Sequence, residues 1–283
     1  MAPKKTIGIV GQGFVGHAVN EGLRGFYNVE TYDKYASEKS SCDDLLELCE
    51  KTNIVFVCLP TPMRQDGSCD LSIVEDTMRQ IDEISYGKHT VVLKSTVPPG
   101  TTERLNETYT RISVVFNPEF LTEANYIDDF KNQNRIIIGG PRPHSTQIKN
   151  LYERVFKNVP IIKTSSTIAE MVKYTANCFL ATKVSFANEI KQLCDVNSVD
   201  YDKVIEYATY DDRLGTSHWK VPGPDGNLGF GGSCFPKDVN ALLVHAKSLE
   251  VDLGVLKAVW ETNLKVRPQR DWEQLKGRAV TQE

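Results

Sequence analysis

The sequence lacks any apolar run long enough to cross a bilayer, and it lacks long blocks of one charge. Its 33 basic and 37 acidic residues are interspersed and leave a net charge of −4, which gives no reason to expect binding to nucleic acid or to a membrane surface. An apolar signal segment is missing after Met1, and the seven cysteines include no Cys-x-x-Cys pair. We therefore expect a cytoplasmic protein whose thiols stay reduced.

Histidine is scarce, and the five histidines show no metal-ligand spacing, so no metal site is expected. A length of 283 residues suggests two domains with separate cores. Short apolar runs alternate with helical patterns up to about residue 163, which is typical of a doubly wound, parallel α/β sheet. Strands are expected at 6–10, 28–32, 53–59, 90–95, 112–117, 135–139 and 159–163, and helices near 14–24, 71–84, 101–108 and 144–157.

A glycine fingerprint, Gly11-x-Gly13-x-x-Gly16, follows the first expected strand and leads into a helical pattern, and the second strand ends at Asp33. This order predicts a Rossmann-like βαβ unit that binds a dinucleotide, with the pyrophosphate at the helix N-terminus. Asp33 would accept a hydrogen bond from a ribose hydroxyl and repel a 2′-phosphate, so NAD is favoured over NADP. The neighbouring Lys34 is the one residue that argues against this preference. The expected NAD site comprises Gly11, Gly13, Phe14, Val15, Gly16, Asp33, Lys34, Pro60, Thr61, Ser95, Thr96 and Glu123.

From Ser165 to about Val196, apolar residues recur at helical spacing without Gly or Pro, which predicts one helix of about 30 residues. A helix of this length can cross a domain and pair with a copy of itself, so we expect a homodimer through residues 165–196. Further helices are expected at 200–208, 237–249 and 254–265. The expected domains are an NAD-binding Rossmann-like domain at 1–164, an all-α central and dimerisation domain at 165–265, and a polar C-terminal tail at 266–283.

One cysteine lies in the segment Gly229-Phe230-Gly231-Gly232-Ser233-Cys234-Phe235-Pro236-Lys237-Asp238, just before a helical pattern. A thiolate at a helix N-terminus beside a lysine is stabilised by the helix dipole and the ammonium, so Cys234 is a candidate nucleophile. The alternative is a small buried residue that only packs. The glycines favour the first interpretation, because they allow positive φ and close approach of the backbone to a ligand.

Three further features are candidates for chemistry. Lys173 and Asn177 are four residues apart on the long helix and can converge on one substrate oxygen. The segment Asn117–Glu123 follows a strand and carries two carboxylates to the edge where such sheets bind ligands. Arg213, in a long loop, can bind a carboxylate or phosphate in a bidentate manner. Each feature has an alternative interpretation. Lys173 could simply be exposed and Asn177 tolerated in the helix, the two carboxylates could be solvated loop acids, and Arg213 could form a surface salt bridge.

Seven motifs follow one another along the chain: the glycine fingerprint, Pro60-Thr61-Pro62, Ser95-Thr96-Val97-Pro98-Pro99-Gly100, Asn117-Pro118-Glu119-Phe120-Leu121-x-Glu123, Lys173-x-x-x-Asn177, Asp212-Arg213-Leu214-Gly215 and the Cys234 segment. Together they resemble the UDP-glucose/GDP-mannose 6-dehydrogenase family over residues 6–265. The resemblance implies NAD-dependent, four-electron oxidation of a nucleotide sugar to a carboxylate, with UDP-glucose as the expected substrate. It makes Cys234 the nucleophile and Glu119 the base for thioester hydrolysis, with Lys173, Asn177 and Asp238 around the reacting oxygen and a water, and Thr96 beside them. The implied substrate contacts are Glu119, Phe120, Leu121, Glu123, Lys173, Asn177, Arg213 (from the partner subunit), Gly229, Phe230 and Gly231.

Members of that family usually continue into a second Rossmann-like domain that binds the nucleotide part of the substrate. This sequence ends at Glu283 and resembles a short form without that domain. Which nucleotide sugar is used, and whether another chain completes the site, stay open. Two other functions also stay open. The 3-hydroxyacid and 6-phosphogluconate dehydrogenases share the Lys-x-x-x-Asn pair but have no use for Cys234, and a non-catalytic NAD-binding remnant needs no nucleophile.

Overall fold

The computed structural model describes residues 5–87 and 89–282. By their internal contacts these residues form two units, which are considered separately. The first unit contains the chain up to Thr61 together with Leu71–Lys173, and the second contains Pro62–Asp70 together with the chain from Tyr174 onward. The sequence predicted a boundary after residue 164, whereas the contacts change within the long helix and assign residues 62–70 to the second unit.

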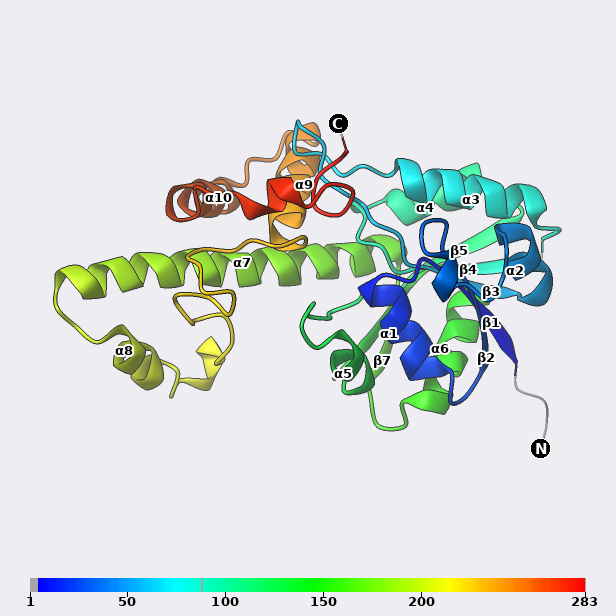
Figure 1. Cartoon of the computed structure of the whole chain (residues 1–283), viewed down its shortest axis with the longest axis horizontal. Coiled ribbons are helices and arrows are strands. Elements are labelled where there is room, and N and C mark those ends of the chain that lie inside the picture. The colour runs from blue at the N-terminus through cyan, green and yellow to red at the C-terminus, as the bar shows by residue number, and fades with distance from the viewer. Residues whose placement is uncertain (1–4, 88, 283) are drawn as a thin grey trace. The chain divides into compact units, whose positions relative to one another are not determined.

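The first unit is built on a seven-stranded sheet (Figure 1). The strands are β1 (Thr6–Val10), β2 (Asn28–Tyr32), β3 (Ile54–Val57), β4 (His89–Leu93), β5 (Ile112–Phe116), β6 (Ile136–Gly139) and β7 (Ile161–Thr164), in the order β2-β1-β3-β4-β5-β6-β7. Neighbours pair in parallel except β5 and β6, which are antiparallel through Phe116 and Gly139. The predicted Rossmann-like α/β fold is therefore confirmed, with one antiparallel pair that the sequence did not predict.

Helices cover both faces of this sheet (Figure 1). Side chains alternate along the buried strands, so that Phe56 of β3 packs in one core and its neighbours Val55 and Val57 pack in the other. Each fully buried aliphatic or aromatic side chain contributes about 1.5–3 kcal/mol. One face carries α1 (Phe14–Leu23), α5 (Tyr126–Lys131) and α6 (His144–Val155), and the other carries α2 (Leu45–Lys51), α3 (Ser72–Ile84) and α4 (Thr101–Thr108).

The carboxyl ends of β1, β3, β4 and β5 lie along one edge of the sheet, because these strands are parallel. The chain order reverses at β1, which has β2 on one side and β3 on the other. In open α/β sheets such a switch point is where ligands bind. The residues that follow these four strands are therefore the ones that can form a site in this unit.

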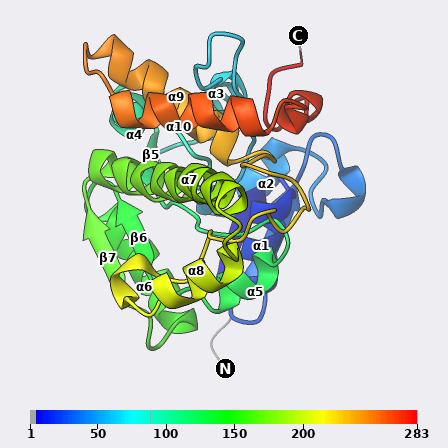
Figure 2. The same ribbon diagram turned by 90° about the vertical axis from the view of Figure 1, so that its left-hand side faces the viewer.

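The second unit is helical. Its long helix α7 (Ser166–Val196) starts in the first unit and contains no Gly or Pro. The helices α9 (Phe235–Ser248) and α10 (Gly254–Val266) pack on one side of α7 around Tyr174 and Cys178, and α8 (Tyr201–Ala208) packs on another side around Ala187 (Figures 1 and 2). Short 3-10 helices occur at Ser37–Lys39, Asp212–Leu214 and Asp271–Gln274. Across the described chain, no helix combines the length and apolarity needed to span a membrane.

The segment after α10 is more than the polar tail expected from its composition. The side chain of Trp272 is 1% exposed, and its ring lies 5.3 Å from that of Trp260. Farther along, the segment pairs with the loop 62–70: the Met63 N–H donates to the Ala279 carbonyl (2.8 Å), and the Thr281 N–H donates to the Met63 carbonyl (3.0 Å). One buried indole among charged residues leaves no periodic pattern, so the sequence did not predict this packing.

Candidate active site

The glycine turn between β1 and α1 leaves room for a ligand at one position only. Gly11 has a φ of +88°, and a Cβ there would lie 2.5 Å from the Cys58 carbonyl oxygen. A Cβ at Gly16 would lie 1.8 Å from the Gly11 oxygen, so Gly16 lets helix and strand pack closely. Gly13 is different, because a Cβ there would meet nothing within 4 Å, and no side chain caps the N-terminus of α1. Open space before an uncapped helix N-terminus fits a pyrophosphate, as expected for NAD.

Asp33 follows β2 and is held in place by two backbone groups. One of its carboxylate oxygens accepts from the Gln12 N–H in the glycine turn (2.7 Å), and the other accepts from the Tyr35 N–H (2.9 Å). The carboxylate is therefore fixed beside the turn, where a ribose hydroxyl of NAD could donate to it. Lys34 is exposed, and its ammonium lies 5.8 Å from the Tyr35 ring centre.

Hydrogen bonds join the loops that follow β3 and β4. The Leu59 N–H donates to Ser95 Oγ (3.0 Å), and Thr61 Oγ1 donates to the Thr96 carbonyl (2.8 Å). Thr61, Ser95 and Thr96 are all buried. The predicted cofactor residues of these two loops therefore form one connected edge of the first unit. Phe14 and Val15 open α1, and the Phe14 ring packs edge-on against Tyr126 at 5.2 Å.

Glu119 and Lys173, predicted separately, form a buried ion pair in the first unit. Lys173 Nζ donates to Glu119 Oε1 (2.8 Å) and to the Glu119 carbonyl (2.6 Å), and Glu119 Oε2 accepts from the Leu121 N–H (2.7 Å). Burial alone would raise the pKa of Glu119, but the Lys173 ammonium and these hydrogen bonds outweigh it and hold the pKa below its ordinary value. Glu119 is therefore a carboxylate next to an ammonium. The Phe120 ring lies 4.0 Å from the Arg135 guanidinium and 5.5 Å from Lys173 Nζ.

A polar network beneath Glu119 was missed at the sequence level. Lys94, the residue after β4, donates to Asn117 Oδ1 (2.9 Å), and the Tyr152 hydroxyl donates to the same oxygen (2.6 Å). The Asn117 amide in turn donates to the Ile137 carbonyl (2.7 Å). Asn117 is thereby fixed two residues before Glu119. The sequence held one sign of this network: Lys94 directly follows the apolar residues of β4.

In the second unit, Cys234 is the N-cap residue of α9, with Pro236 in the first turn. Its sulfur lies 3.8 Å from Ser233 Oγ. Lys237 donates to Asp238 Oδ1 (2.5 Å), and Asp238 is 1% exposed. Burial would lower the pKa of Lys237, but Asp238 and, more weakly, Cys234 outweigh this effect and raise it. An ammonium thus stays charged in the first turn of the helix that Cys234 caps.

Asn177 completes the polar group around Asp238. Its Nδ2 donates to Asp238 Oδ2 (2.6 Å), so both carboxylate oxygens of this buried residue have partners. Asn177 lies one helical turn after Lys173 on α7. The convergence of Lys173 and Asn177 on one substrate oxygen remains a prediction, because in the structure each has its own partner, Glu119 and Asp238 respectively.

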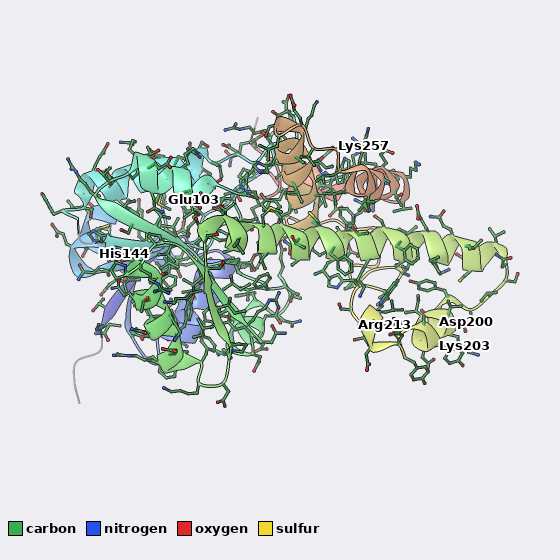
Figure 3. The ribbon with its side chains drawn as sticks, turned by 180° about the vertical axis from the view of Figure 1, so that it is seen from behind. Glu103, His144, Asp200, Lys203, Arg213 and Lys257 are labelled. Atoms are coloured by element: carbon green, nitrogen blue, oxygen red, sulfur yellow. The ribbon has the colours of Figure 1, made fainter. Side chains whose placement is uncertain are left out.

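The remaining predicted residues lie on loops. Glu123 is exposed in the loop before α5. Arg213 is 88% exposed at its side chain, and its guanidinium pairs with Asp211 (2.5 Å), on the segment beside α8 (Figure 3). Gly229, Phe230 and Gly231 lie in the loop before Cys234, where a Cβ at Gly229 or Gly231 would lie 2.4 Å from the side chains of Asn263 and Arg267. These two glycines therefore accommodate the protein's own side chains, whereas a Cβ at Gly232 would meet nothing within 4 Å.

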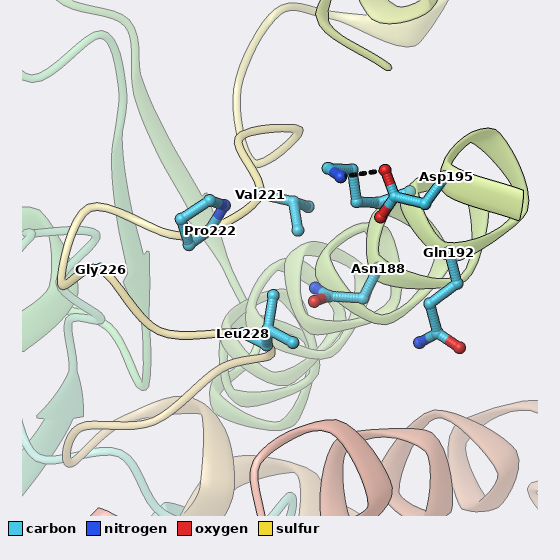
Figure 4. A pocket seen from close by; sticks show the side chains of 8 residues that line it. Asn188, Gln192, Asp195, Val221, Pro222, Gly226 and Leu228 are labelled. Carbon is cyan, nitrogen blue, oxygen red and sulfur yellow. Dashed lines mark hydrogen bonds and ion pairs between the residues drawn. The ribbon is translucent and has the colours of Figure 1, made fainter. Parts of the chain in front are cut away.

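A cavity of about 330 Å³ opens in the second unit between α7 and the loop at 221–228 (Figure 4). Two of its lining residues, Gly226 and Leu228, belong to the segment 225–231, whose backbone is expected from the family resemblance to contact the sugar nucleotide. The other lining residues were not predicted from the sequence: Asn188, Lys191, Gln192, Asp195, Val221 and Pro222. Lys191 and Asp195 form an ion pair on its rim. Among residues 5–87 and 89–282, no cluster of three or more His, Cys, Asp or Glu side chains is arranged to hold a metal ion.

Comparison with known proteins agrees with this geometry. Residues 30–159 match the NAD binding domain of the UDP-glucose/GDP-mannose dehydrogenase family, and residues 167–265 match its central domain. The chain is 38% identical over 232 residues to the UDP-glucose 6-dehydrogenase TuaD of Bacillus subtilis (strain 168), a match that covers 80% of this chain and 49% of that protein. The chain thus spans about half the length of the curated relatives it matches.

Solved structures extend the likeness to the fold. A UDP-glucose dehydrogenase from the hyperthermophilic archaeon Pyrobaculum islandicum superposes with a TM-score of 0.84 at 32% identity, over 96% of this chain and 70% of that one. A 3-hydroxyisobutyrate dehydrogenase of Mycobacterium tuberculosis has a TM-score of 0.76 over 94% of this chain and 95% of its own, but at 13% identity it shares the fold alone. The matches to the two family domains and to TuaD show that the chain belongs to the UDP-glucose/GDP-mannose dehydrogenase family.

Proposed function

We propose that this chain catalyses the NAD-dependent oxidation of the 6-hydroxyl of a nucleotide sugar to a carboxylate, with UDP-glucose as substrate and Cys234 as the covalent nucleophile. The observation that carries the proposal is the position of Cys234 as the N-cap of α9, beside Lys237, which is 13% exposed, and the buried Asp238 and Asn177. A plain alcohol dehydrogenase has no need for a thiol there. UDP-glucose is chosen because curated relatives such as TuaD are named for it.

When bound, NAD supplies the hydride acceptor for each of the two oxidation steps. In the first step the 6-hydroxyl loses its proton and the C6 carbon loses a hydride, which gives an aldehyde. The Cys234 thiolate then adds to the aldehyde carbon, so a carbon–sulfur bond forms and the oxygen takes a proton. Loss of that proton and of the second hydride leaves a thioester. Water finally adds to the thioester carbon, the carbon–sulfur bond breaks, and the acid and the thiolate separate.

The chain's own polar groups have distinct roles in this scheme. The Lys173 ammonium and the Asn177 amide would donate to the reacting oxygen as negative charge develops on it, which is usually worth a few kcal/mol of barrier. Glu119 would accept a proton from the hydrolytic water. Its lowered pKa keeps it unprotonated, and moving Lys173 onto the substrate oxygen would free its carboxylate for that task. Asp238 would hold Asn177 and a water in place.

The amount of NADH formed for each UDP-glucose tests the proposal. The purified protein should form two NADH and one UDP-glucuronate per sugar. One NADH per substrate would instead indicate a single alcohol oxidation, as in the hydroxyacid dehydrogenases whose fold the chain shares. No NADH in the presence of bound NAD would indicate a non-catalytic NAD-binding protein.

Replacing Cys234 with serine separates the covalent step from cofactor binding. We expect Cys234→Ser to abolish formation of the acid while leaving the affinity for NAD within about threefold, because the expected cofactor groups belong to the first unit. Acid is measured by chromatography and NAD affinity by calorimetry. Cys194→Ser, which changes a buried thiol near the C-terminal end of α7 in the same unit, is the control and should keep full activity. Normal glucuronate production by Cys234→Ser would contradict the thioester mechanism.

We also propose that the active form is a homodimer that pairs through α7. Phe179, Phe186 and Leu193 are 63%, 50% and 60% exposed and are spaced by seven residues, so they form one apolar line along the helix. A second copy of the same straight helix offers a matching line, which is the usual arrangement of a two-fold interface. Arg213 would reach the substrate of the partner subunit. The seven cysteines, all of them among the described residues, form no disulfide, which agrees with the proposed cytoplasmic setting.

A further inference from the structure

The backbone before Cys234 is held by buried polar side chains that the proposed mechanism does not use. The Asn188 side chain accepts from the Gly229 N–H (3.1 Å), and Figure 4 shows Asn188 beside Leu228. Asn263 accepts from the Phe230 N–H (2.7 Å) and donates to the Phe230 carbonyl (2.9 Å). Consecutive residues of a glycine-rich loop are thereby held in one conformation, although glycine alone would allow many.

Arg267 and Asp271 bind both ends of this loop. The Arg267 guanidinium donates to Asp225 Oδ2 (2.6 Å) at the start of the loop and to the Leu228 carbonyl (3.2 Å) in its middle. It also donates through Nε to Asp271 Oδ1 (2.6 Å), and Asp271 Oδ2 accepts from the Gly232 N–H (3.1 Å). Gly232 is two residues before Cys234. Arg267 is buried, so these bonds account for a charge that water hardly reaches.

The lowered pKa values of Asp225 and Asp271 agree with ion pairs between their carboxylates and Arg267. Burial would raise the pKa of Asp271 and that of Asp225, but the Arg267 guanidinium lowers both to below their ordinary values. The close contact also explains a sequence feature. A Cβ at Gly231 would lie 2.4 Å from Arg267 Nη2, so the backbone and the guanidinium touch only because residue 231 is glycine.

We infer that Arg267 and Asp271 are positioning residues that set the place of the Cys234 thiol through the Gly232 amide. The thiol lies between two restrained points. On one side Asp271 holds Gly232, and on the other Asp238 fixes the first turn of α9 through Lys237 and Asn177. Releasing the first point lets the glycines move, so the thiol would sample many positions relative to the substrate carbon, and a displacement of about 1 Å can cost a hundredfold in rate. The catalytic consequence, but not the restraint of the loop, rests on the function proposed above.

Asp271→Asn tests this inference with almost no change in volume. One carboxylate oxygen of Asp271 faces Arg267 and the other faces the Gly232 N–H, so in asparagine one of these donors meets an NH2 group instead of an acceptor. We expect the peptide amides of residues 229–232 to exchange with deuterium at least tenfold faster, and kcat/KM for UDP-glucose to fall at least tenfold, with NAD affinity within twofold. Glu273→Gln is the matched control, because it neutralises an exposed acid two residues away that pairs only with Arg270 among its described contacts.

One additional measurement and one additional variant keep the outcomes separate. Alkylation of Cys234 by iodoacetamide, followed by peptide mass without substrate or NAD, reports on the thiol even if UDP-glucose is not the substrate. We expect its rate constant to change at least threefold in Asp271→Asn and to stay unchanged in Glu273→Gln. Should Asp271→Asn fail to fold, Asp225→Asn removes a bond to a half-exposed carboxylate at the far end of the loop and should give the same changes at smaller size.

Unchanged exchange of residues 229–232, or an unchanged alkylation rate in the folded variants, overturns the positioning role whatever the activity. If exchange is faster and alkylation is altered but UDP-glucose is still turned over at the full rate, the positioning by Asp271 is not important for catalysis. A wild-type protein that oxidises no nucleotide sugar would refute the proposed function instead, and the exchange and alkylation results would still decide whether Asp271 positions the thiol.

Discussion

Lys94 is charged although it lies at the carboxyl end of a strand and is only 4% exposed. Burial lowers its pKa to about 8, even though Cys58 and Glu119 nearby favour the ammonium. Relative to an ordinary lysine with a pKa near 10.5, the charged form is disfavoured in the folded protein by on the order of 3 kcal/mol. This penalty depends on pH and can therefore be measured.

The free energy of unfolding should rise with pH relative to that of the variant Lys94→Met. Between pH 8 and 10.5 the unfolded chain keeps the Lys94 proton while the folded protein loses it, so the unfolded state binds more protons and stability increases with pH. Below pH 8 both states are protonated and the difference is constant. Urea unfolding at several pH values should show wild type gaining up to about 3 kcal/mol over Lys94→Met across this window. An exposed-site control, Lys131→Met, should show no such trend, and parallel curves for Lys94→Met and wild type would contradict the lowered pKa.

Asp33 carries a second prediction at the residue scale. Asp33→Ala removes a charged acceptor for the NAD ribose and also a partner of the Gln12 N–H, so NAD binding should weaken by roughly 1–3 kcal/mol. Calorimetric titration of NAD gives the dissociation constants. Asp43→Ala, an exposed aspartate of the same unit, is the control and should bind like wild type. Unchanged affinity in Asp33→Ala would show that this carboxylate does not contact the ribose.

The candidate residues that the sequence proposed were those inside local motifs. Cys234, Lys173 and Glu119 were proposed because a turn, a helix spacing or a strand end marks each one. Arg267 was not proposed, because Asp225 is 42 positions away in the sequence and its near partner Asp271 has the spacing of an ordinary surface pair. A buried ion pair between distant residues has no local signature, so only the folded chain reveals it.

Helix α7 supports a prediction at the scale of an element. Phe179→Asp puts a charge into the exposed apolar line without disturbing Phe186, whose ring also packs on Trp219. If two copies pair through this line, the variant should sediment as a monomer and lose turnover while still binding NAD, since burying an unpaired carboxylate at an interface is unfavourable. Val255→Asp changes an equally exposed apolar residue on α10 and should stay dimeric. Wild-type protein that sediments as a fully active monomer would contradict the proposed dimer.

Elements with a clear apolar pattern were predicted within a few residues, and two short helices were missed. Strands β1, β3, β4, β5 and β6 are largely buried and rich in apolar residues, and α7 has an uninterrupted helical period. Helices α2 and α5 are seven and six residues long and were missed. For α2 a signal was present, because Asp44 caps the helix by accepting from the Glu47 N–H (2.8 Å). The direction of β6 was also not predictable, since an apolar strand has the same pattern whether its neighbour is parallel or antiparallel.

For the whole molecule, the structure predicts that the two units lose stability separately. Trp272→Ala empties a buried site in the second unit and should reduce its free energy of unfolding by about 3–5 kcal/mol. NAD binding should persist, because the sheet of the first unit has its own cores. Urea unfolding followed by circular dichroism, with parallel NAD titrations, measures both effects. Tyr210→Ala, at an exposed aromatic, should change stability by less than about 0.5 kcal/mol, and a similarly small change in Trp272→Ala would contradict the buried position.

The pairing of Met63 with residues 279–281 has a consequence for how the chain folds as it is synthesised. Residues 62–70 are made between a strand and a helix of the first unit, yet their partners at 279–281 are made only after α10. The sheet of the first unit can assemble while this loop waits without its backbone partners, because domains generally form in the order in which they are translated. The helical unit that carries Cys234 can close only after residues 279–281 have emerged, so the thiol reaches its final surroundings well after α9 itself has been made.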